Sequence, residues 1–427
     1  MDKINLKQIL FDQKKEIEKI TSDKTLIERD ILAESKKYIK TDLIKIITGV
    51  RRSGKSVFSL QLLKDKKFAY VNFDDEKLFN ITSNDLNDVL EVLHEIYPNF
   101  KYLFLDEVQN IYGWELFANR CRRQGHNILI TGSNAKLLSR ELATHLTGRH
   151  VAIELYPFSF NEFLKYHHLI YTDDDFYLTE KRAQIKRHLN DYIKNGGFPE
   201  ALRYIEIHNR YLSDLYNTII GKDIINRYNI RNSKSMKDIS IYLISNYGSQ
   251  ISYNKLKNLF DIKSVHTAEN YAEYIEEAYL IFQLHRFSFK TKLQLITSGK
   301  VYSTDTGLAN VISPRSFDNT GRLIENVVAL ELKKRSKEIY YWRSDQQEEV
   351  DFVIKHGLKV VQLIQVSYNI DNINTKERET KALVKAGDEL KCDDLIIITW
   401  DYEAQEETKG KKIKYIPLWK WLLNNNL

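Results

Sequence analysis

The chain has 427 residues, enough for two to four compact units, because a single hydrophobic core stops growing efficiently well below this length. Its hydrophobic fraction of 43% and charged fraction of 29% are ordinary for a globular protein and argue against a disordered or fibrous chain. The 64 basic and 58 acidic residues leave a formal net charge of +6, which permits a nucleic-acid partner without indicating one.

Cysteine usage and hydropathy indicate the compartment. Cys121 and Cys392 lie far apart and outside any CxxC or Cys/His grouping, so neither a zinc site nor a disulfide framework is expected. The amino terminus lacks the apolar stretch of a secretory signal, and no later apolar run approaches the length that spans a bilayer. We therefore expect a soluble, cytoplasmic protein without membrane contact.

The first part of the chain predicts helices followed by an α/β domain. Residues 1–40 are charged, with apolar residues at helical or near-helical spacings, and predict a helical amino-terminal segment. In residues 41–165 short apolar strands alternate with helical patterns, which predicts a parallel sheet covered by helices on both faces. The expected strands are 43–48, 68–73, 102–105, 127–131 and 151–155.

Three further parts follow. Residues 166–235 are helical and aromatic around a Gly196-Gly197 turn and predict a lid or linker. Residues 236–312 carry three helical patterns before a β-like stretch, the order of a winged-helix-like domain. In residues 313–427 helices and strands return as a second α/β unit.

A complete G-x-x-x-x-G-K-S motif lies where the first expected strand turns into a helix. It consists of Gly49, Val50, Arg51, Arg52, Ser53, Gly54, Lys55 and Ser56. Glycines let successive backbone N–H groups converge on phosphates, and the helix amino terminus adds partial positive charge. Lys55 is expected to reach the β- and γ-phosphates, Ser56 to ligate Mg²⁺, and Phe58 to lie beside the nucleotide. The motif predicts a site for Mg-ATP, with a chance glycine-rich turn as the alternative.

Two adjacent carboxylates end the strand that begins at Tyr102. Asp106 is expected to hold the magnesium shell, and Glu107 to polarise the attacking water as general base. Alone, such a pair is more often a solvated acidic turn. The upstream phosphate-binding loop favours the catalytic interpretation.

Polar residues near the next two strands are weaker candidates. Ser133 or Asn134, after the strand 127–131, would sense the γ-phosphate if that strand neighbours the phosphate-binding loop; an ordinary helix cap is the alternative. Arg149 is a candidate arginine finger, and an exposed structural arginine is the alternative.

Together these motifs resemble the AAA-superfamily ATPases of bacteria and archaea that carry a carboxy-terminal domain of unknown function. The resemblance also rests on Pro157-Phe158-Ser159-Phe160, Gly196-Gly197-Phe198-Pro199-Glu200, Asp305-Thr306-Gly307-Leu308, Glu325-Asn326 and Glu349-Val350-Asp351-Phe352. It implies an AAA-type sheet with a central P-loop strand, a sensor-one role for Ser133 and a finger role for Arg149. A finger acting on a neighbouring subunit would require a homo-oligomer.

The winged-helix-like part leaves its partner open. His266, Thr267 and Asn270 lie on the second of two helices separated by a turn, where a recognition helix would contact DNA bases. Lys255, Lys257 and Lys263 would meet phosphates. Acidic residues along the same helix, including Glu269 and Glu273, oppose phosphate contact, and winged helices also bind proteins. DNA and a protein partner both remain open.

The last domain resembles the PD-(D/E)xK nuclease core, in which acidic residues gather divalent metals for phosphodiester attack. Glu325 and Asp351 occupy two of the expected places, but Gln365-Val366-Ser367 lacks the third carboxylate and the lysine. We therefore expect a nuclease-like fold without nuclease activity.

Three functions follow from these motifs. The leading hypothesis is a Mg-dependent ATPase whose nucleotide state moves the other domains, acting on DNA or a protein partner. The second is a switch or scaffold that holds ATP with little turnover. The third is an ATP-gated nuclease with Glu325, Glu349 and Asp351 as unconventional metal ligands.

Overall fold

The computed structural model describes residues 2–133, 148–290, 294, 299–313, 320–368 and 370–424. They divide into two compact units. The first is Met1–Tyr156 with Glu277–Tyr279, and the second is Pro157–Glu276 with Leu280–Leu427.

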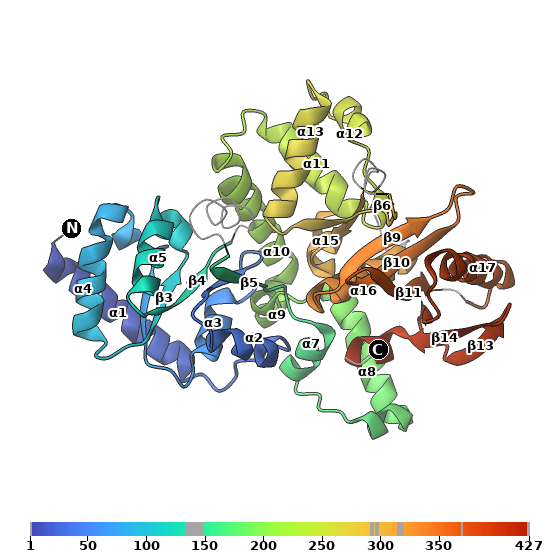
Figure 1. Cartoon of the computed structure of the whole chain (residues 1–427), viewed down its shortest axis with the longest axis horizontal. Coiled ribbons are helices and arrows are strands. Elements are labelled where there is room, and N and C mark those ends of the chain that lie inside the picture. The colour runs from blue at the N-terminus through green and yellow to red at the C-terminus, as the bar shows by residue number, and fades with distance from the viewer. Residues whose placement is uncertain are drawn as a thin grey trace. The chain divides into compact units, whose positions relative to one another are not determined.

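A parallel sheet forms the centre of the first unit, with five strands among the described residues in the order β2-β3-β4-β1-β5. The strands are β1 (Ile44–Thr48), β2 (Phe68–Asn72), β3 (Tyr102–Asp106), β4 (Asn127–Thr131) and β5 (His150–Glu154). Strand β1 lies between β4 and β5, and β4 separates it from β3 (Figure 1). The expected α/β, AAA-type parallel sheet is confirmed, and the P-loop strand β1, expected to be central, is an inner strand next to the edge strand β5.

Helices cover this sheet. They are α1 (Lys3–Thr21), α2 (Leu32–Ile39), α3 (Lys55–Leu62), α4 (Leu86–Ile96) and α5 (Trp114–Arg123). Helix α1 packs against α4 and β2, and α2 packs against α3. Because α1 buries Leu6, Ile9 and Leu10 in the core of this unit, the amino-terminal helices are part of the sheet domain's packing.

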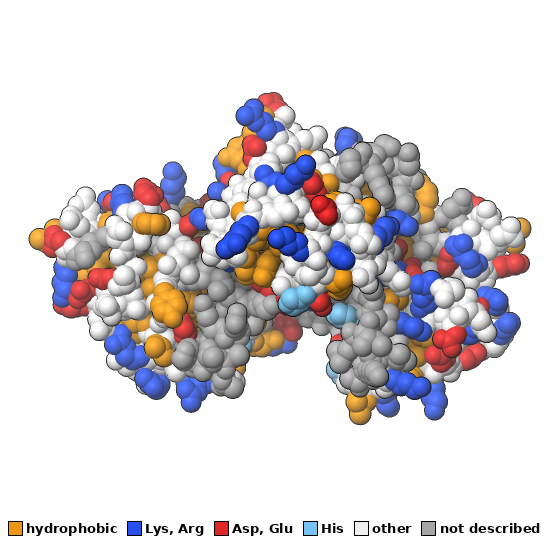
Figure 2. All heavy atoms as spheres, turned by 90° about the horizontal axis from the view of Figure 1, so that it is seen from above, with side chains coloured by type: hydrophobic (Ala, Val, Ile, Leu, Met, Phe, Trp, Pro, Cys, Tyr) orange, Lys and Arg blue, Asp and Glu red, His pale blue; other side chains and the backbone are white. Residues whose placement is uncertain are grey.

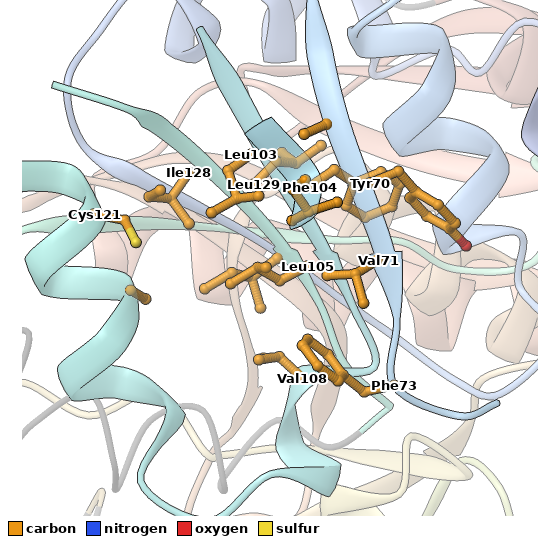
Figure 3. Close-up of a cluster of buried hydrophobic side chains, with 14 of the residues drawn as sticks. Tyr70, Val71, Phe73, Leu103, Phe104, Leu105, Val108, Cys121, Ile128 and Leu129 are labelled. Carbon is orange, nitrogen blue, oxygen red and sulfur yellow. The ribbon is translucent and has the colours of Figure 1, made fainter. Parts of the chain in front are cut away.

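The core of this unit holds the strand ends in register. Figure 3 shows apolar side chains of β2, β3 and β4 packed together, with Cys121 of α5 facing them. The rings of Tyr70 and Phe104 meet edge to face with centroids 5.1 Å apart. A close-packed interior resists deformation, so polar residues at the strand ends keep fixed positions.

The second unit begins with a run of consecutive helices, and further helices lie between its strands. The helices after Pro157 are α7 (Phe160–Tyr166), α8 (Thr179–Asn195), α9 (Pro199–Arg203), α10 (His208–Thr218), the π-helix η6 (Ile219–Asn226), α11 (Ser233–Ser245), α12 (Tyr253–Leu259), α13 (Val265–Glu277), α15 (Thr306–Ile312), α16 (Thr320–Lys334), α17 (Ile373–Leu390) and α18 (Leu418–Leu423). Elements α11, β6, α12, α13, β7 and β8 follow one another in the order that prompted the winged-helix-like interpretation.

Two sheets complete the second unit within the described residues. An antiparallel sheet has the order β6-β8-β7, and a six-stranded mixed sheet has the order β13-β14-β12-β11-β10-β9. The strands are β6 (Ser249–Gln250), β7 (Ile281–Leu284), β8 (Lys300–Ser303), β9 (Glu338–Arg343), β10 (Glu349–His356), β11 (Lys359–Ser367), β12 (Leu395–Thr399), β13 (Ala404–Thr408) and β14 (Lys411–Pro417).

Several downstream motifs meet at one packing point in the second unit. The Gly197 backbone N–H donates to Asp305 Oδ2 at 2.7 Å, and the Phe158 N–H donates to the Gly197 carbonyl at 2.8 Å. The other oxygen of Asp305 caps α15 by accepting from the Leu308 N–H at 2.8 Å. A Cβ on Gly307 would lie 2.0 Å from the Asn195 carbonyl oxygen. These motifs are therefore explained by close backbone packing.

The surface matches the near-balance of charge in the sequence. Figure 2 shows basic and acidic side chains interspersed over one face of the molecule. Among the described helices, none combines the length and apolar composition needed to cross a bilayer.

Candidate nucleotide site

Two glycines shape the loop between β1 and α3. Gly49 has φ +142°, and a Cβ there would lie 2.0 Å from the carbonyl oxygen of Leu155. Gly54 has φ +91° and occupies the amino-terminal cap of α3. A side chain at position 49 would clash with backbone, so the loop conformation requires glycine there.

Lys55 and Ser53 place polar groups at this loop. The buried Lys55 ammonium donates to the carbonyl oxygens of Gly49 and Val50, each at 3.1 Å. The Ser53 hydroxyl is fully buried and has no hydrogen-bond partner among the described residues. Arg51 is half-buried and Arg52 is exposed in a left-handed conformation with φ +68°.

Asp106 is the polar centre of the site. Its Oδ1 accepts from the Ser56 hydroxyl at 3.1 Å and from the Thr131 hydroxyl, and its Oδ2 accepts from the Tyr70 hydroxyl at 3.0 Å. Burial, with a smaller effect from the charge of Glu107, raises the pKa of Asp106 to about 6, although these hydrogen bonds oppose the shift. Ser56 and Asp106, predicted to share a metal, are therefore in direct contact.

Glu107 follows directly at the end of β3 in a left-handed conformation with φ +51°. Its backbone N–H donates to Thr131 Oγ1 at 3.0 Å, which ties the end of β3 to β4. Its carboxylate accepts from the Gln109 side-chain amide. Glu107 is thus held beside Asp106 with an oriented carboxylate.

The remaining predicted residues fall in different places. Ser133 is buried just beyond β4, and its hydroxyl has no hydrogen-bond partner among the described residues. The preceding Gly132 N–H donates to the Ile47 carbonyl at 3.1 Å, which ties this segment to β1. Asn134 lies outside the described residues. Phe58 is fully buried in the apolar core.

Arg149 lies at the end of the parallel strands opposite to the phosphate-binding loop. Its carbonyl accepts from the Ile44 N–H at the start of β1, whereas the loop follows Thr48 at the other end of that strand. Its side chain is exposed. Arg149 is therefore not brought to the loop of its own chain.

The donor set fits a magnesium nucleotide. Mg²⁺ prefers oxygen ligands and is usually bound by one or two carboxylates together with substrate phosphates and waters. Ser56 and Asp106 supply such oxygens, and the hydroxyls of Ser53 and Ser133 are buried polar groups that a ligand would satisfy. Across the described ranges, no group of three or more His, Cys, Asp or Glu is arranged to hold a metal by itself.

Sequence reasoning missed residues that support this site. The Arg29 guanidinium donates to the Ser53 carbonyl at 2.9 Å and to the Tyr156 carbonyl at 2.6 Å. The Tyr279 hydroxyl, from the segment Glu277–Tyr279 of the same unit, donates to Thr48 Oγ1 at 2.7 Å. Both are distant in sequence from the loop and match no local motif, so only the fold reveals them.

The winged-helix-like candidates differ in exposure, and Lys257, Thr267 and Asn270 are half-buried. His266 is exposed, with its Nδ1 3.9 Å from Glu269 Oε2, and Lys255 and Lys263 are also exposed. Glu269 and Glu273 are exposed on the same helix, α13. Of the other two acidic residues expected to oppose phosphate contact, Glu276 is half-buried and Glu277 is buried, so Glu269 and Glu273 carry the acidic character at the surface.

The nuclease-like candidates gather in the second unit. Glu325 lies on α16, and Glu349 and Asp351 lie on β10. The side-chain oxygen of Gln365 accepts from the Asp351 N–H at 3.1 Å, and Ser367 is buried at the end of β11. Burial, followed by the charge of Glu325, raises the pKa of Asp351 to about 8.

Family models match three successive parts of the chain. An AAA domain matches residues 41–164, a domain of unknown function (DUF8612) matches residues 186–319, and another (DUF4143) matches residues 320–421.

Two uncharacterized proteins resemble nearly the whole chain. One from Methanocaldococcus jannaschii is 39% identical, covering 95% of this chain and 96% of the relative. One from Haemophilus influenzae is 31% identical, covering 93% and 99%. Among solved structures, the Aeropyrum pernix ORC1 protein in complex with DNA is 11% identical with a TM-score of 0.30, covering 69% of this chain and 94% of that one.

Proposed function

This chain belongs to the family of AAA-domain proteins that end in a domain of unknown function, and from that membership and the site's geometry we propose that it is a Mg-dependent ATPase. The observation that carries the proposal is the contact between Ser56 Oγ and Asp106 Oδ1 at 3.1 Å, next to Lys55 and Glu107. These side chains come from α3 and from the end of β3, and the sheet brings them to one edge.

Each residue has a distinct role in this proposal. Bound Mg-ATP supplies the phosphoanhydride bond and a cation that neutralises developing charge. Lys55 leaves the loop carbonyls to bind the β- and γ-phosphates, and Ser56 and Asp106 hold the cation's coordination shell. Glu107 accepts the proton of the attacking water, and Ser133 senses the γ-phosphate.

Lys55→Ala and Glu107→Gln test these roles separately. Lys55→Ala should abolish binding of Mg-ATP in a calorimetric titration, because the loop loses its ammonium. Glu107→Gln should bind Mg-ATP as wild type does but release phosphate at least about 100-fold more slowly, since a general base contributes on this scale. Phosphate release at the wild-type rate by Glu107→Gln would remove this residue as the base.

The same measurements separate an ATPase from a low-turnover switch. Stoichiometric bound nucleotide in the purified wild-type chain, with negligible phosphate release, would identify a switch or scaffold. Steady phosphate release that depends on Mg²⁺ and is lost in Lys55→Ala would identify the ATPase.

We further propose that the nucleotide state alters the second unit. Tyr279 bonds to Thr48, which directly precedes Gly49, and the chain on both sides of Glu277–Tyr279 belongs to the second unit. A shift of the loop on nucleotide binding would therefore act directly on this segment. The partner on which such a change acts is DNA or a protein. Binding assays with each candidate, with and without nucleotide, would identify it.

A further inference from the structure

A buried ammonium lies in the acidic cluster of the second unit. The Lys300 side chain on β8 is 4% exposed, and its Nζ lies 2.6 Å from Glu349 Oε1, 3.1 Å from Glu325 Oε1 and 3.3 Å from Asp351 Oδ1. The carboxylates come from α16 and β10. One cation thus receives an oxygen from each of three carboxylates.

Further hydrogen bonds hold these carboxylates in place. The Tyr302 hydroxyl donates to Glu325 Oε1 at 2.7 Å, and the Val366 N–H donates to Asp351 Oδ2 at 3.0 Å. The Gln365 side chain accepts from the Asp351 N–H through its oxygen, and its amide nitrogen donates to the Glu379 carboxylate at 2.6 Å. The arrangement is therefore anchored from several elements and would persist when one side chain is shortened.

Lys300 does not balance the cluster. One ammonium faces three carboxyl groups, so ionised carboxyls would leave negative charge in excess, and buried unpaired charge is costly. Convergent carboxylate oxygens are also the ligands that Mg²⁺ and Mn²⁺ prefer.

We propose that Glu325, Glu349 and Asp351 form a latent divalent-metal site that Lys300 occupies as a resident cation, so that the native chain binds no metal there. The Nζ atom sits where oxygens of all three residues converge, the place a metal would take. A tethered ammonium is held at a high effective concentration, so it fills that place in preference to dissolved cations. This inference does not depend on the function proposed for the nucleotide site.

Removal of the ammonium should open the site. Lys300→Ala is expected to bind Mn²⁺ at least about tenfold more tightly than wild type. Without nucleotide, Mn²⁺ at about a hundredfold above its dissociation constant should raise the melting temperature of this variant by about 5 °C, while wild type does not respond.

Two further variants assign the response. Lys300→Ala/Asp351→Asn should lose the added Mn²⁺ affinity, because a ligand is removed. Lys355 lies on β10, as Glu349 and Asp351 do, and forms an ion pair with Glu338 of β9; Lys355→Ala should respond like wild type. Any weak binding at the nucleotide site is common to all of them and is subtracted.

Several results would overturn the proposal. Mn²⁺ binding by wild type that Asp351→Asn abolishes would show that a metal and not Lys300 fills the site. Metal-dependent DNA cleavage by wild type that Asp351→Ala abolishes would do the same. A folded Lys300→Ala that gains no Mn²⁺ affinity would also refute it. If Lys300→Ala does not fold, Lys300→Gln is used in its place, and its refolding yield is compared in Mn²⁺ and in EDTA. Equal yields would count against the proposal.

Discussion

Asp106 is expected to destabilise the ligand-free chain at neutral pH. Its pKa is raised from the ordinary 3.8 to about 6, chiefly by burial. The folded chain therefore binds this proton more tightly than the unfolded chain, and the contribution of Asp106 to stability falls as pH rises from about 4 to about 6. Since one pKa unit corresponds to about 1.4 kcal/mol, ionised Asp106 costs the folded state about 3 kcal/mol.

Asp106→Asn removes this cost while keeping the shape of the side chain. Its remaining oxygen still accepts from the Ser56 and Thr131 hydroxyls, but the bond from Tyr70 must reverse. We expect the ligand-free variant to exceed wild type in free energy of unfolding by about 1–3 kcal/mol at pH 8, with the difference vanishing near pH 4.

Urea denaturation of both proteins in EDTA at several pH values measures this difference. The chain has two units, so the transition must be followed with a probe in the first unit. Added Mg-ATP should stabilise wild type and have little effect on Asp106→Asn. A variant less stable than wild type at pH 8, or a gap that does not change with pH, would refute the reasoning.

Two arginines provide further predictions. Arg29→Ala leaves the carbonyls of Ser53 and Tyr156 without its guanidinium and should lower stability by about 2–4 kcal/mol and weaken Mg-ATP binding; Arg29→Lys, which cannot reach both carbonyls as a fork, should be intermediate, and wild-type affinity in both variants would contradict a positioning role. Arg149→Ala should bind Mg-ATP normally but hydrolyse it about 1,000-fold more slowly if Arg149 acts on a neighbouring copy. Mixing it with Lys55→Ala should then restore activity, because one protein supplies the sites and the other the fingers; additive, unrestored rates would exclude this role.

The strands of the first unit could be predicted to within about a residue at either end. Strands β1, β3 and β4 are buried on both faces, so each appears as an apolar run bounded by polar or glycine residues. Their order could not be derived from these runs, because nothing local specifies that β4 lies between β1 and β3. The resemblance to AAA-superfamily proteins implies only a central P-loop strand, not the order of the other strands.

The nucleotide-site residues were predictable where each follows a strand. Ser56 and Asp106 are 50 positions apart, but parallel strands end at the same edge of a sheet, so their contact follows from the motifs. The hydroxyls of Tyr70 and Thr131 also donate hydrogen bonds to Asp106. No local sequence pattern predicts that a tyrosine within a strand will bond to this carboxylate. Phe58 shows the converse, since its place beside the motif does not tell whether its ring faces nucleotide or core.

The two acidic centres differ in the source of their counter-charge. The described hydrogen-bond partners of Asp106 are neutral hydroxyls, which support a carboxylate but leave its charge for an external cation to balance. Asp351 instead faces the ammonium of Lys300 within hydrogen-bonding distance. This difference supports our proposal of a magnesium nucleotide at the first site, whereas Lys300 supplies the cation at the second site. Lys300 precedes Asp351 by 51 positions and lies on a different sheet, so the sequence segment Gln365-Val366-Ser367, which lacks the expected lysine, does not reveal that another lysine faces this cluster.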